Sequence, residues 1–456
     1  SACTISQDGD VFFTGVCTAT TLTGAASGLT GALPAISGAN LTNLPAANLT
    51  GALPAISGAN LTGIAATDNV RTGILDVAGI ATFRNDVNIG AAVTISESGI
   101  EASGIGITVA NINGGQISGR RNMVINGKAQ VNQRGDSTGN TSGGYYGPDR
   151  FETSIYGGTF SHSRSTSGST LPEFPRCIKI DCTSAASAPT STQELKIGYL
   201  MEGQDVQHLQ YGTSSAKSTT LSFYVRSNKT ETYTAWFYRP DGTRHNAVNF
   251  SVSAADTWEK KIITIVGDTT STINDDNTMG FKIDWILSTG ADYKSGSALN
   301  GSWGALTNAN RYVGNTGTFG QSTSDYFEIT GVQFEVGTQA TAFEHRSYGE
   351  ELKLCRRYYE QIQPQLLVLA RYSHHDGNGY TQFYFEVEKR SAPSGSYTGT
   401  FESGSGYSGN PQFSYNDASI TQAINIQGSN SITAGGINYL HGSPSDPGIC
   451  KFDAEL

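Results

Sequence analysis

The chain has 456 residues, of which 15% are charged, and its formal net charge is −10. An acidic balance argues against a nucleic-acid partner, because phosphate binding needs a basic surface. No stretch of 18 apolar residues occurs, so no membrane insertion is expected, and the length allows about two to four domains.

The first 119 residues differ in composition from the rest. Their only aromatic residues are Phe12, Phe13 and Phe83, and the first Lys of the chain is Lys128. Within them, the segment TGALPAISGANLT occupies residues 30–42 and recurs unchanged at 50–62. Pro fixes the backbone and removes a hydrogen-bond donor, while Gly favours turns. Residues 26–74 are therefore expected to form a repeat shaft that is not helical.

Residues 75–119 have a different pattern, in which apolar pairs such as Val87/Ile89 and Val93/Ile95 alternate with Gly. The pattern predicts short β-strands joined by tight turns. Neither part of the shaft is large enough to bury its own Leu, Ile and Val, so it needs stacking or association with further copies. A homotrimer meets this need most simply, although the pattern does not give the number of copies.

Residues 120–347 are expected to form one all-β domain. Six strand-like runs occur here, and in one of them Leu221, Phe223 and Val225 alternate with polar residues. Clusters of Gly, Asn, Asp and Ser separate the runs, a spacing that predicts a two-sheet, jelly-roll-like β-sandwich. The six runs are residues 176–182, 219–227, 232–238, 258–266, 280–287 and 325–336.

Residues 348–456 are expected to hold a short connecting helix and a small C-terminal β domain that forms the tip. The helix prediction rests on SYGEELKLCRRYY (347–359), where Ser347 and Glu350 have the spacing of a capping box. The run QFYFEVEKR (382–390) predicts a strand. The predicted fold class is all-β with one short helix.

The six Cys residues show neither C-x-x-C nor a Cys/His cluster at zinc spacing, so no cofactor is expected. Cys177 and Cys182 are five residues apart on a predicted strand, which places them on opposite faces and argues against a disulfide. The most metal-like feature is His374 with His375. Adjacent strand residues cannot chelate one ion together, but three copies of either His could meet on a trimer axis. The alternative is a polar loop.

Three carboxylate pairs could serve glycoside cleavage, which needs two carboxyl groups on either side of the sugar. One pair shares a predicted strand with Lys389 and Arg390, one lies in a loop, and one opens the predicted helix, where acids are favoured. Surface or capping roles explain all three, so the chain is expected not to be an enzyme. The pairs are Glu386/Glu388, Asp275/Asp276 and Glu350/Glu351.

Carbohydrate binding needs aromatic rings that stack on sugars and polar side chains that hold the hydroxyls. Trp236, Trp258 and Trp285 lie in strand runs and are expected in the core, which leaves Trp303 as the best candidate. Binding usually uses the loops at the ends of a sandwich. The alternative is that these aromatic residues cover loops or subunit interfaces. The candidates are Trp303, Tyr312, Tyr145, Tyr146, His374, Asp376, Asn378, Tyr380 and Tyr407.

Five segments carry a resemblance to a known family. The repeat LTGALPAISGANLTNLPAANLTG and the following ILDVAGIATFRNDVNIG are two of them. The others are RNMVINGKAQVNQRG with GPDRF (147–151), the segment 326–359 ending in LCRRYY, and the final DAEL. Together they resemble tail fibre proteins of tailed bacteriophages, especially those of marine phages that infect cyanobacteria. The segment 326–359 is the most specific of these.

The resemblance implies a homotrimeric fibre on the virion, made in the host cytoplasm, that mediates adsorption to a bacterium. It implies that residues 1–25 attach to other tail proteins. It also implies that the distal domains bind a surface glycan, usually polysaccharide, or an outer-membrane receptor. The alternatives are a structural fibre attached to the capsid or baseplate, and a polysaccharide depolymerase.

Overall fold

The structure is a computed structural model of the whole chain. It describes residues 3–5, 7–14, 120–166, 170–363, 367–369, 379–381, 384–403, 412–414, 425–428, 438–442 and 445–456. The chain divides into two compact units, residues 1–101 and 102–456. In the first unit, β1 (Cys3–Ile5) and β2 (Val11–Phe13) pair as an antiparallel hairpin. The predicted repeat shaft and short-strand shaft lie outside the described residues.

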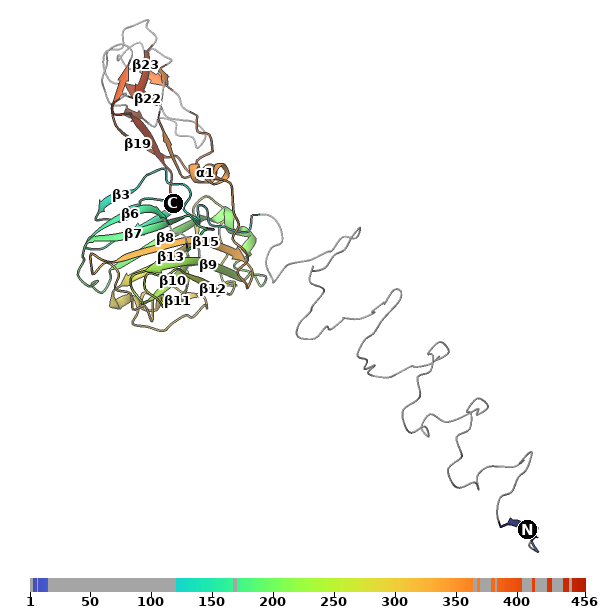
Figure 1. Cartoon of the computed structure of the whole chain (residues 1–456). Helices are drawn as coiled ribbons and strands as arrows, with labels where there is room; N and C mark the ends of the chain where they lie inside the picture. The colour runs from blue at the N-terminus through green and yellow to red at the C-terminus, as the bar shows by residue number, and fades with distance from the viewer. Residues whose placement is uncertain are drawn as a thin grey trace. The chain divides into compact units, whose positions relative to one another are not determined.

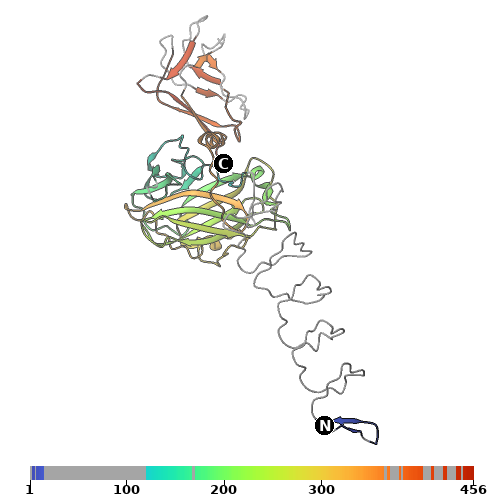
Figure 2. The same ribbon diagram turned by 45° about the vertical axis from the view of Figure 1, so that its right-hand side comes forward.

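Two antiparallel sheets form the sandwich of the second unit (Figures 1 and 2). The seven-stranded sheet has the order β14 (Gly304–Ala305), β11 (Arg244–Ser251), β10 (Thr232–Arg239), β13 (Met279–Thr289), β8 (Glu194–Glu202), β5 (Phe151–Ser154), β4 (Gly144–Tyr145). The six-stranded sheet has the order β12 (Glu259–Ile265), β9 (Thr219–Ser227), β15 (Tyr326–Val336), β7 (Arg176–Ser184), β6 (Thr159–Thr166), β3 (Ser137–Asn140).

All six strand-like runs of the sequence are strands of this sandwich: β7, β9, β10, β12, β13 and β15. Their alternation works as predicted, because Leu221, Phe223 and Val225 of β9 are fully buried between the sheets. Trp236 and Trp285 are buried as expected, whereas Trp258 is only half-buried. The two-sheet sandwich is therefore confirmed.

Several strands are missing from the prediction. In β8, Leu195, Ile197, Tyr199 and Met201 all face the core, so the alternation was present but interrupted by charged residues and Gly198. Strands β3, β5, β6 and β11 are rich in polar residues and lack a clear apolar pattern. The 3-10 helices η5 (Gly203–Leu209), η6 (Ala291–Tyr293) and η7 (Asn308–Asn310) were also not predicted.

The predicted helix is α1 (Tyr348–Arg356), and its capping box is present. Ser347 Oγ accepts from the Glu350 backbone N–H, and the Glu350 carboxylate accepts from the Ser347 backbone N–H at 3.0 Å. Cys177, Cys182, Cys355 and Cys450 are buried free thiols, as the opposite faces of Cys177 and Cys182 suggested for that pair.

Three small antiparallel sheets follow α1. The first is β16 (Tyr359–Ile362), β24 (Ile449–Asp453), β19 (Ser394–Thr398); the second is β17 (Leu367–Leu369), β23 (Asn438–Gly442), β20 (Phe401–Ser403); the third is β18 (Gly379–Thr381), β22 (Asn425–Gly428), β21 (Gln412–Ser414). The β-rich character is as predicted. The strand predicted at 382–390 is wrong over its described residues 384–390, because Glu386 pairs with Arg356 and Lys389 with Glu360, and the chain bends there.

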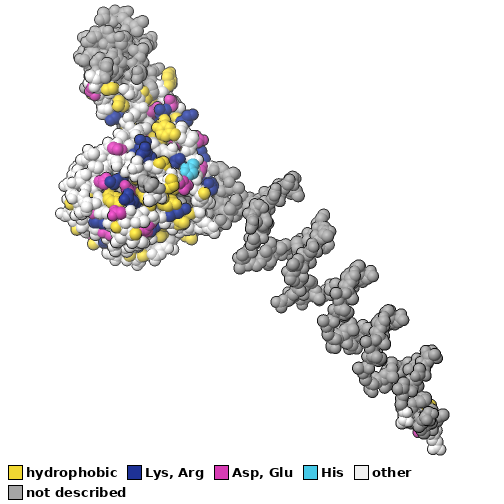
Figure 3. Space-filling model, viewed as in Figure 1, with side chains coloured by type: hydrophobic (Ala, Val, Ile, Leu, Met, Phe, Trp, Pro, Cys, Tyr) yellow, Lys and Arg dark blue, Asp and Glu magenta, His cyan; other side chains and the backbone are white. Residues whose placement is uncertain are grey.

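Charged side chains of both signs are interspersed on the face of the sandwich turned to the viewer in Figure 3. On the six-stranded sheet, Lys179 pairs with Asp181 at 2.8 Å and Arg226 pairs with Glu328 at 3.2 Å. Pairing of this kind brings opposite charges together on the sheet. Among the described residues, no helix is long and apolar enough to cross a membrane.

Candidate functional site

The aromatic residues nominated from the sequence do not meet at one site. His374, His375, Asp376, Asn378 and Tyr407 lie outside the described residues. Tyr380 belongs to β18, where its backbone pairs with that of Gln427, and its side chain is not described. Within the described ranges, no three metal-ligating side chains cluster, and the trimer-axis metal site remains untested.

Tyr312 was expected at the surface, and this expectation is wrong, because the side chain is fully buried. Its hydroxyl donates to Glu194 at 2.6 Å, and its ring packs edge-on against Trp236. Burial, with the nearby Glu194 carboxylate, raises the pKa of Tyr312 far above its usual value. The ring supports the outer face of the seven-stranded sheet and has no free face for a sugar.

Tyr145 and Tyr146 are half-buried. The Tyr145 hydroxyl donates to the Leu456 carbonyl at 3.2 Å, and its ring lies 5.3 Å from the Arg134 guanidinium. Tyr146 packs against His162 with ring centroids 5.0 Å apart. Both rings therefore have protein partners, and Tyr145 belongs to a larger network.

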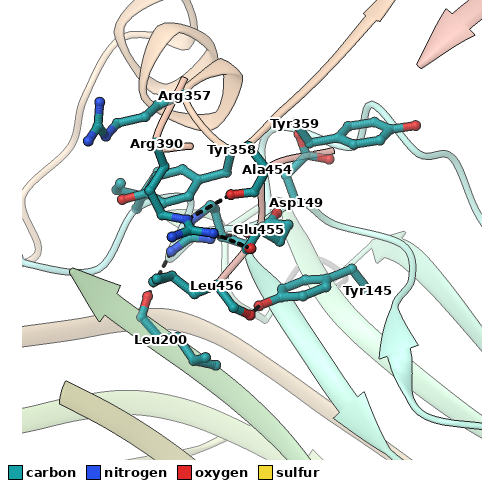
Figure 4. A network of polar contacts seen from close by, with 12 residues as sticks. Tyr145, Asp149, Leu200, Arg357, Tyr358, Tyr359, Arg390, Ala454, Glu455 and Leu456 are labelled. Atoms are coloured by element: carbon teal, nitrogen blue, oxygen red, sulfur yellow. Dashed lines mark hydrogen bonds and ion pairs between the residues drawn. The ribbon is translucent and has the colours of Figure 1, made fainter. Parts of the chain in front are cut away.

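That network joins the last residues of the chain to the sandwich (Figure 4). We call it the junction network and define it as Arg134, Tyr145, Asp149, Arg150, Tyr358, Arg390 and residues 453–456. The Arg150 guanidinium pairs with Glu455, donates to the Leu200 carbonyl at 2.7 Å and lies 3.4 Å from the Tyr358 ring centroid. Arg390 donates to the carbonyls of Ala454 and Glu455, so backbone and side chains are both held.

Several junction groups have perturbed pKa values. Burial raises the pKa of Glu455, although Arg150 and Arg134 oppose this, and burial likewise raises the pKa of Asp149. Perturbed groups in one cluster are often catalytic. Here, however, Arg150 is 1% exposed and Glu455 is 4% exposed at the side chain, and each is bonded to other protein groups. The network is an anchor between β24 and the sandwich.

An open pocket of about 460 Å³ lies on the sandwich beside η5. Its floor is formed by the buried side chains of Val206, Tyr211 and Ile273. Exposed amides and hydroxyls surround the floor, and the lining includes no charged residue. These rim residues are Gln207, Gln210, Thr213, Ser215 and Thr272. We call this the neutral pocket.

The walls of the neutral pocket are cross-linked. The Gln207 amide of η5 donates to the carbonyls of Ile273 and Asn274 at 3.2 and 3.1 Å. The Gly212 backbone N–H donates to the Asp268 carbonyl at 2.7 Å. Gly212 has φ +84°, and a Cβ there would overlap the backbone of Ser271. Only Gly therefore allows the two walls to approach this closely.

Trp303, the best candidate from the sequence, lies behind the floor of this pocket and is half-buried. Its ring meets Tyr211 edge-on at 5.8 Å, and its indole N–H donates to the Val266 carbonyl at 2.8 Å. Trp303 does not line the pocket but holds Tyr211, which does. The sequence signal was thus close to the site without belonging to it.

The pocket residues themselves were missed. The segment VQHLQYGTSS (206–215) has no strong motif, and the sequence candidates were mostly aromatic residues of predicted loops. A usable signal was Gly212, which follows Tyr211 and precedes the three hydroxyl residues at 213–215. The second wall, residues 272–273, is 57 positions beyond Ser215 and no local pattern connects the two.

No protein-family model matches the chain, and no curated protein matches it. Among solved structures, it is similar to the enzymatically active domain of tailspike protein 4 of bacteriophage CBA120, at 12% identity and TM-score 0.23. That match covers 47% of this chain and 21% of the tailspike chain.

Two further similar structures are carbohydrate-binding modules. One is the CBM22-1 xylan-binding domain from Paenibacillus barcinonensis, at 7% identity and TM-score 0.25, covering 50% of this chain and all of that chain. The other is a family 11 module from Clostridium thermocellum in complex with a mixed-linked tetrasaccharide, at 11% identity and TM-score 0.22, covering 46% and 98%. Similarity at this level does not assign the chain to a family.

Proposed function

We propose that this protein is a non-enzymatic glycan-binding fibre, a tail fibre of a tailed bacteriophage that adsorbs the virion to its host. The observation that carries the binding part is the neutral pocket. Amides and hydroxyls around an apolar floor are what a sugar needs, since its ring has an apolar face and a hydroxylated edge. The volume of the pocket lies in the usual range for small-molecule sites, roughly 300–1,000 Å³.

Binding without cleavage is the simplest chemistry for this pocket. Hydrolysis of a glycosidic bond needs a general acid and a second carboxylate or base, and no carboxyl group lines the pocket. In each carboxylate pair considered from the sequence, at least one member has a structural partner: Glu386 pairs with Arg356, and Asp276 accepts from Thr278 at 2.6 Å. Glu351 is buried and accepts from the Asn126 backbone N–H.

The fibre part of the proposal rests on the sequence. The repeat unit within residues 26–74 is short, so we expect its apolar side chains to need further copies for burial, and the motif segments resemble tail fibres. Three copies on one axis would present three pockets, so that weak single sites would still give strong attachment. Light scattering of the purified full chain tests this: we expect the mass of three chains, and a stable monomer or dimer would contradict it.

The binding part is tested with purified full chain and surface polysaccharide from a susceptible host. We expect saturable retention of the protein on the immobilised polysaccharide and no rise in reducing ends over hours. Release of reducing ends with turnover would show that the protein is an enzyme. Absence of any retention on host polysaccharide would remove the glycan-binding proposal. Imaging of the intact virion would locate the fibre, and density on the capsid would exclude the tail.

A further inference from the structure

The neutral pocket differs from the rest of the sandwich surface in one respect that bears on its ligand. Its rim is built only from amide and hydroxyl side chains, on a protein whose surface elsewhere is rich in ion pairs. The Gln210, Ser215 and Thr272 side chains make no hydrogen bond within the described structure. They are exposed and ready to bond a ligand. Each offers groups that suit a sugar hydroxyl, which both donates and accepts.

Arg239 is a cation close to the floor of the pocket, and other protein groups already bind its guanidinium. Arg239 is fully buried, and its guanidinium lies 5.2 Å from the Tyr211 ring. It pairs with Asp268 and donates to the Ser271 carbonyl. Arg244 donates to the same Asp268 carboxylate at 2.8 and 3.0 Å, and the pKa of Asp268 is lowered because these bonds outweigh its burial. No charged side chain lines the pocket itself, so its lining offers no cation to an anionic group of a ligand.

The backbone of the pocket walls is held in unusual conformations. Gln210 has φ +55° and Ser271 has φ +82°, values that side-chain-bearing residues rarely adopt. Gly212, between the two walls, also has a positive φ. Such residues persist only where surrounding contacts hold them, and they cluster at ligand clamps. The cross-links through Gln207 and Asp268 make the pocket pre-formed, which lowers the entropy cost of binding.

We propose that the neutral pocket binds one uncharged pyranose unit of the glycan and discriminates against uronic acids and against sulfated or phosphorylated sugars. The apolar ring face would lie on Val206, Tyr211 and Ile273, and the hydroxyls would meet the rim. A carboxylate placed there would lose its hydration without gaining a charged partner, which is unfavourable. This inference rests on the proposed glycan-binding function and gives it a site and a ligand class.

The test is calorimetric titration of the full chain with paired oligosaccharides, neutral hexose oligomers and the matching uronic-acid oligomers. Wild type should bind a neutral oligomer more tightly than its acidic counterpart. Thr272→Val, which keeps shape and removes one hydroxyl, should weaken neutral binding roughly three- to tenfold. Ser215→Trp should fill the pocket and abolish binding of the neutral oligomer. Thr257→Val is the matched control, because Thr257 is exposed and outside the pocket.

Melting curves for every variant test whether a loss of binding comes from misfolding. If Ser215→Trp fails to fold, Thr272→Val alone tests the location of the site. Equal or tighter binding of the acidic oligomer would overturn the ligand class while leaving glycan binding intact. Neutral binding that survives both pocket substitutions would overturn the location of the site. Failure of wild type to bind any oligomer, with no retention on host polysaccharide, would overturn the proposed function together with this inference.

Discussion

The junction network and the neutral pocket are two polar regions of the second unit that differ in the charge and the pairing of their side chains. The junction contains paired charges: the buried Arg150 with the buried Glu455, and Arg134 with the more exposed Asp453 at 2.9 Å. The pocket has no charge in its lining, and several of its polar groups are unused. Buried paired charges hold parts of a protein together, whereas exposed unpaired hydroxyls and amides await a ligand. The most conspicuous cluster of titratable groups is therefore the structural one.

The comparison also separates two kinds of sequence signal. The segments that resemble tail fibres supply the junction: Arg134, Asp149, Arg150, Tyr358 and Glu455 all belong to them. The pocket segments 206–215 and 272–273 lie outside these motifs. The motif segments thus supply a structural joint, while the neutral pocket is built from other residues.

Removing one partner of the junction should have the largest effect on stability. Arg150→Met removes one of the two cations that pair with the buried Glu455 carboxylate and leaves Arg134 at 3.3 Å, so we expect a loss of about 3 kcal/mol in the free energy of unfolding. Chemical denaturation measures it. Arg176→Met, at an exposed Arg at the start of β7, should change stability by less than about 0.5 kcal/mol. Equal effects of the two would mean that the junction is not an anchor.

Acid should lower the stability of the fold through two buried His residues but leave the affinity of the pocket unchanged. Burial lowers the pKa of His162 and of His245 to about 4. The unfolded chain takes up these protons near pH 6.5 and the folded chain only near pH 4, so stability falls as the pH drops through that window. Each His should cost about 2 kcal/mol between pH 7 and pH 5.

Two buried carboxyl groups change the stability in the opposite direction as the pH falls. The effect of the His residues is therefore measured by comparing a variant with wild type. Burial raises the pKa of Glu455 and Asp149, so the folded chain takes up their protons at a higher pH than the unfolded chain. Comparing wild type with His162→Gln isolates the His, since the variant should lose less stability on acidification. The affinity of the folded protein for a neutral glycan should stay constant from pH 8 to pH 5. A steep change would place a titrating group in the pocket.

Tyr312→Phe should show whether Tyr312 contributes to the stability of the sandwich or to glycan affinity. The substitution removes the buried hydrogen bond to Glu194, and we expect a loss of about 1–2 kcal/mol in stability with unchanged glycan affinity. Tyr238→Phe is the matched control, because Tyr238 stacks on Trp236 and is only half-buried. A tenfold loss of affinity in Tyr312→Phe with normal stability would restore the sequence-based prediction that Tyr312 contacts the glycan.

Trp303→Phe should have the smallest effect. It removes the hydrogen bond to the Val266 carbonyl and loosens the support of Tyr211, so we expect about 1 kcal/mol of destabilisation. Glycan affinity should fall only a few-fold, less than in Thr272→Val, as titration of both variants would show. A complete loss of binding in this variant alone would make Trp303 a contact residue and move the site.

The sequence was informative where local pattern and burial agree. Leu221, Phe223 and Val225 predicted β9, and Ser347 with Glu350 predicted the start of α1. The run 384–390 has strand-forming residues, but the chain bends at residues 386–387 and makes ion pairs with Arg356 and Glu360 instead of continuing a strand. The pocket could not be predicted, because its two walls meet only through tertiary contacts such as Gln207 to Ile273.

The central claim is that the uncharged pocket binds a neutral sugar and that the charged junction does not. It is tested most directly by titrating one neutral oligosaccharide into wild type, Thr272→Val and the junction variant Glu455→Gln, each at a temperature where it is folded. We predict weaker binding only in Thr272→Val and lower thermal stability only in Glu455→Gln. Unchanged affinity in Thr272→Val together with lost affinity in folded Glu455→Gln would contradict the claim.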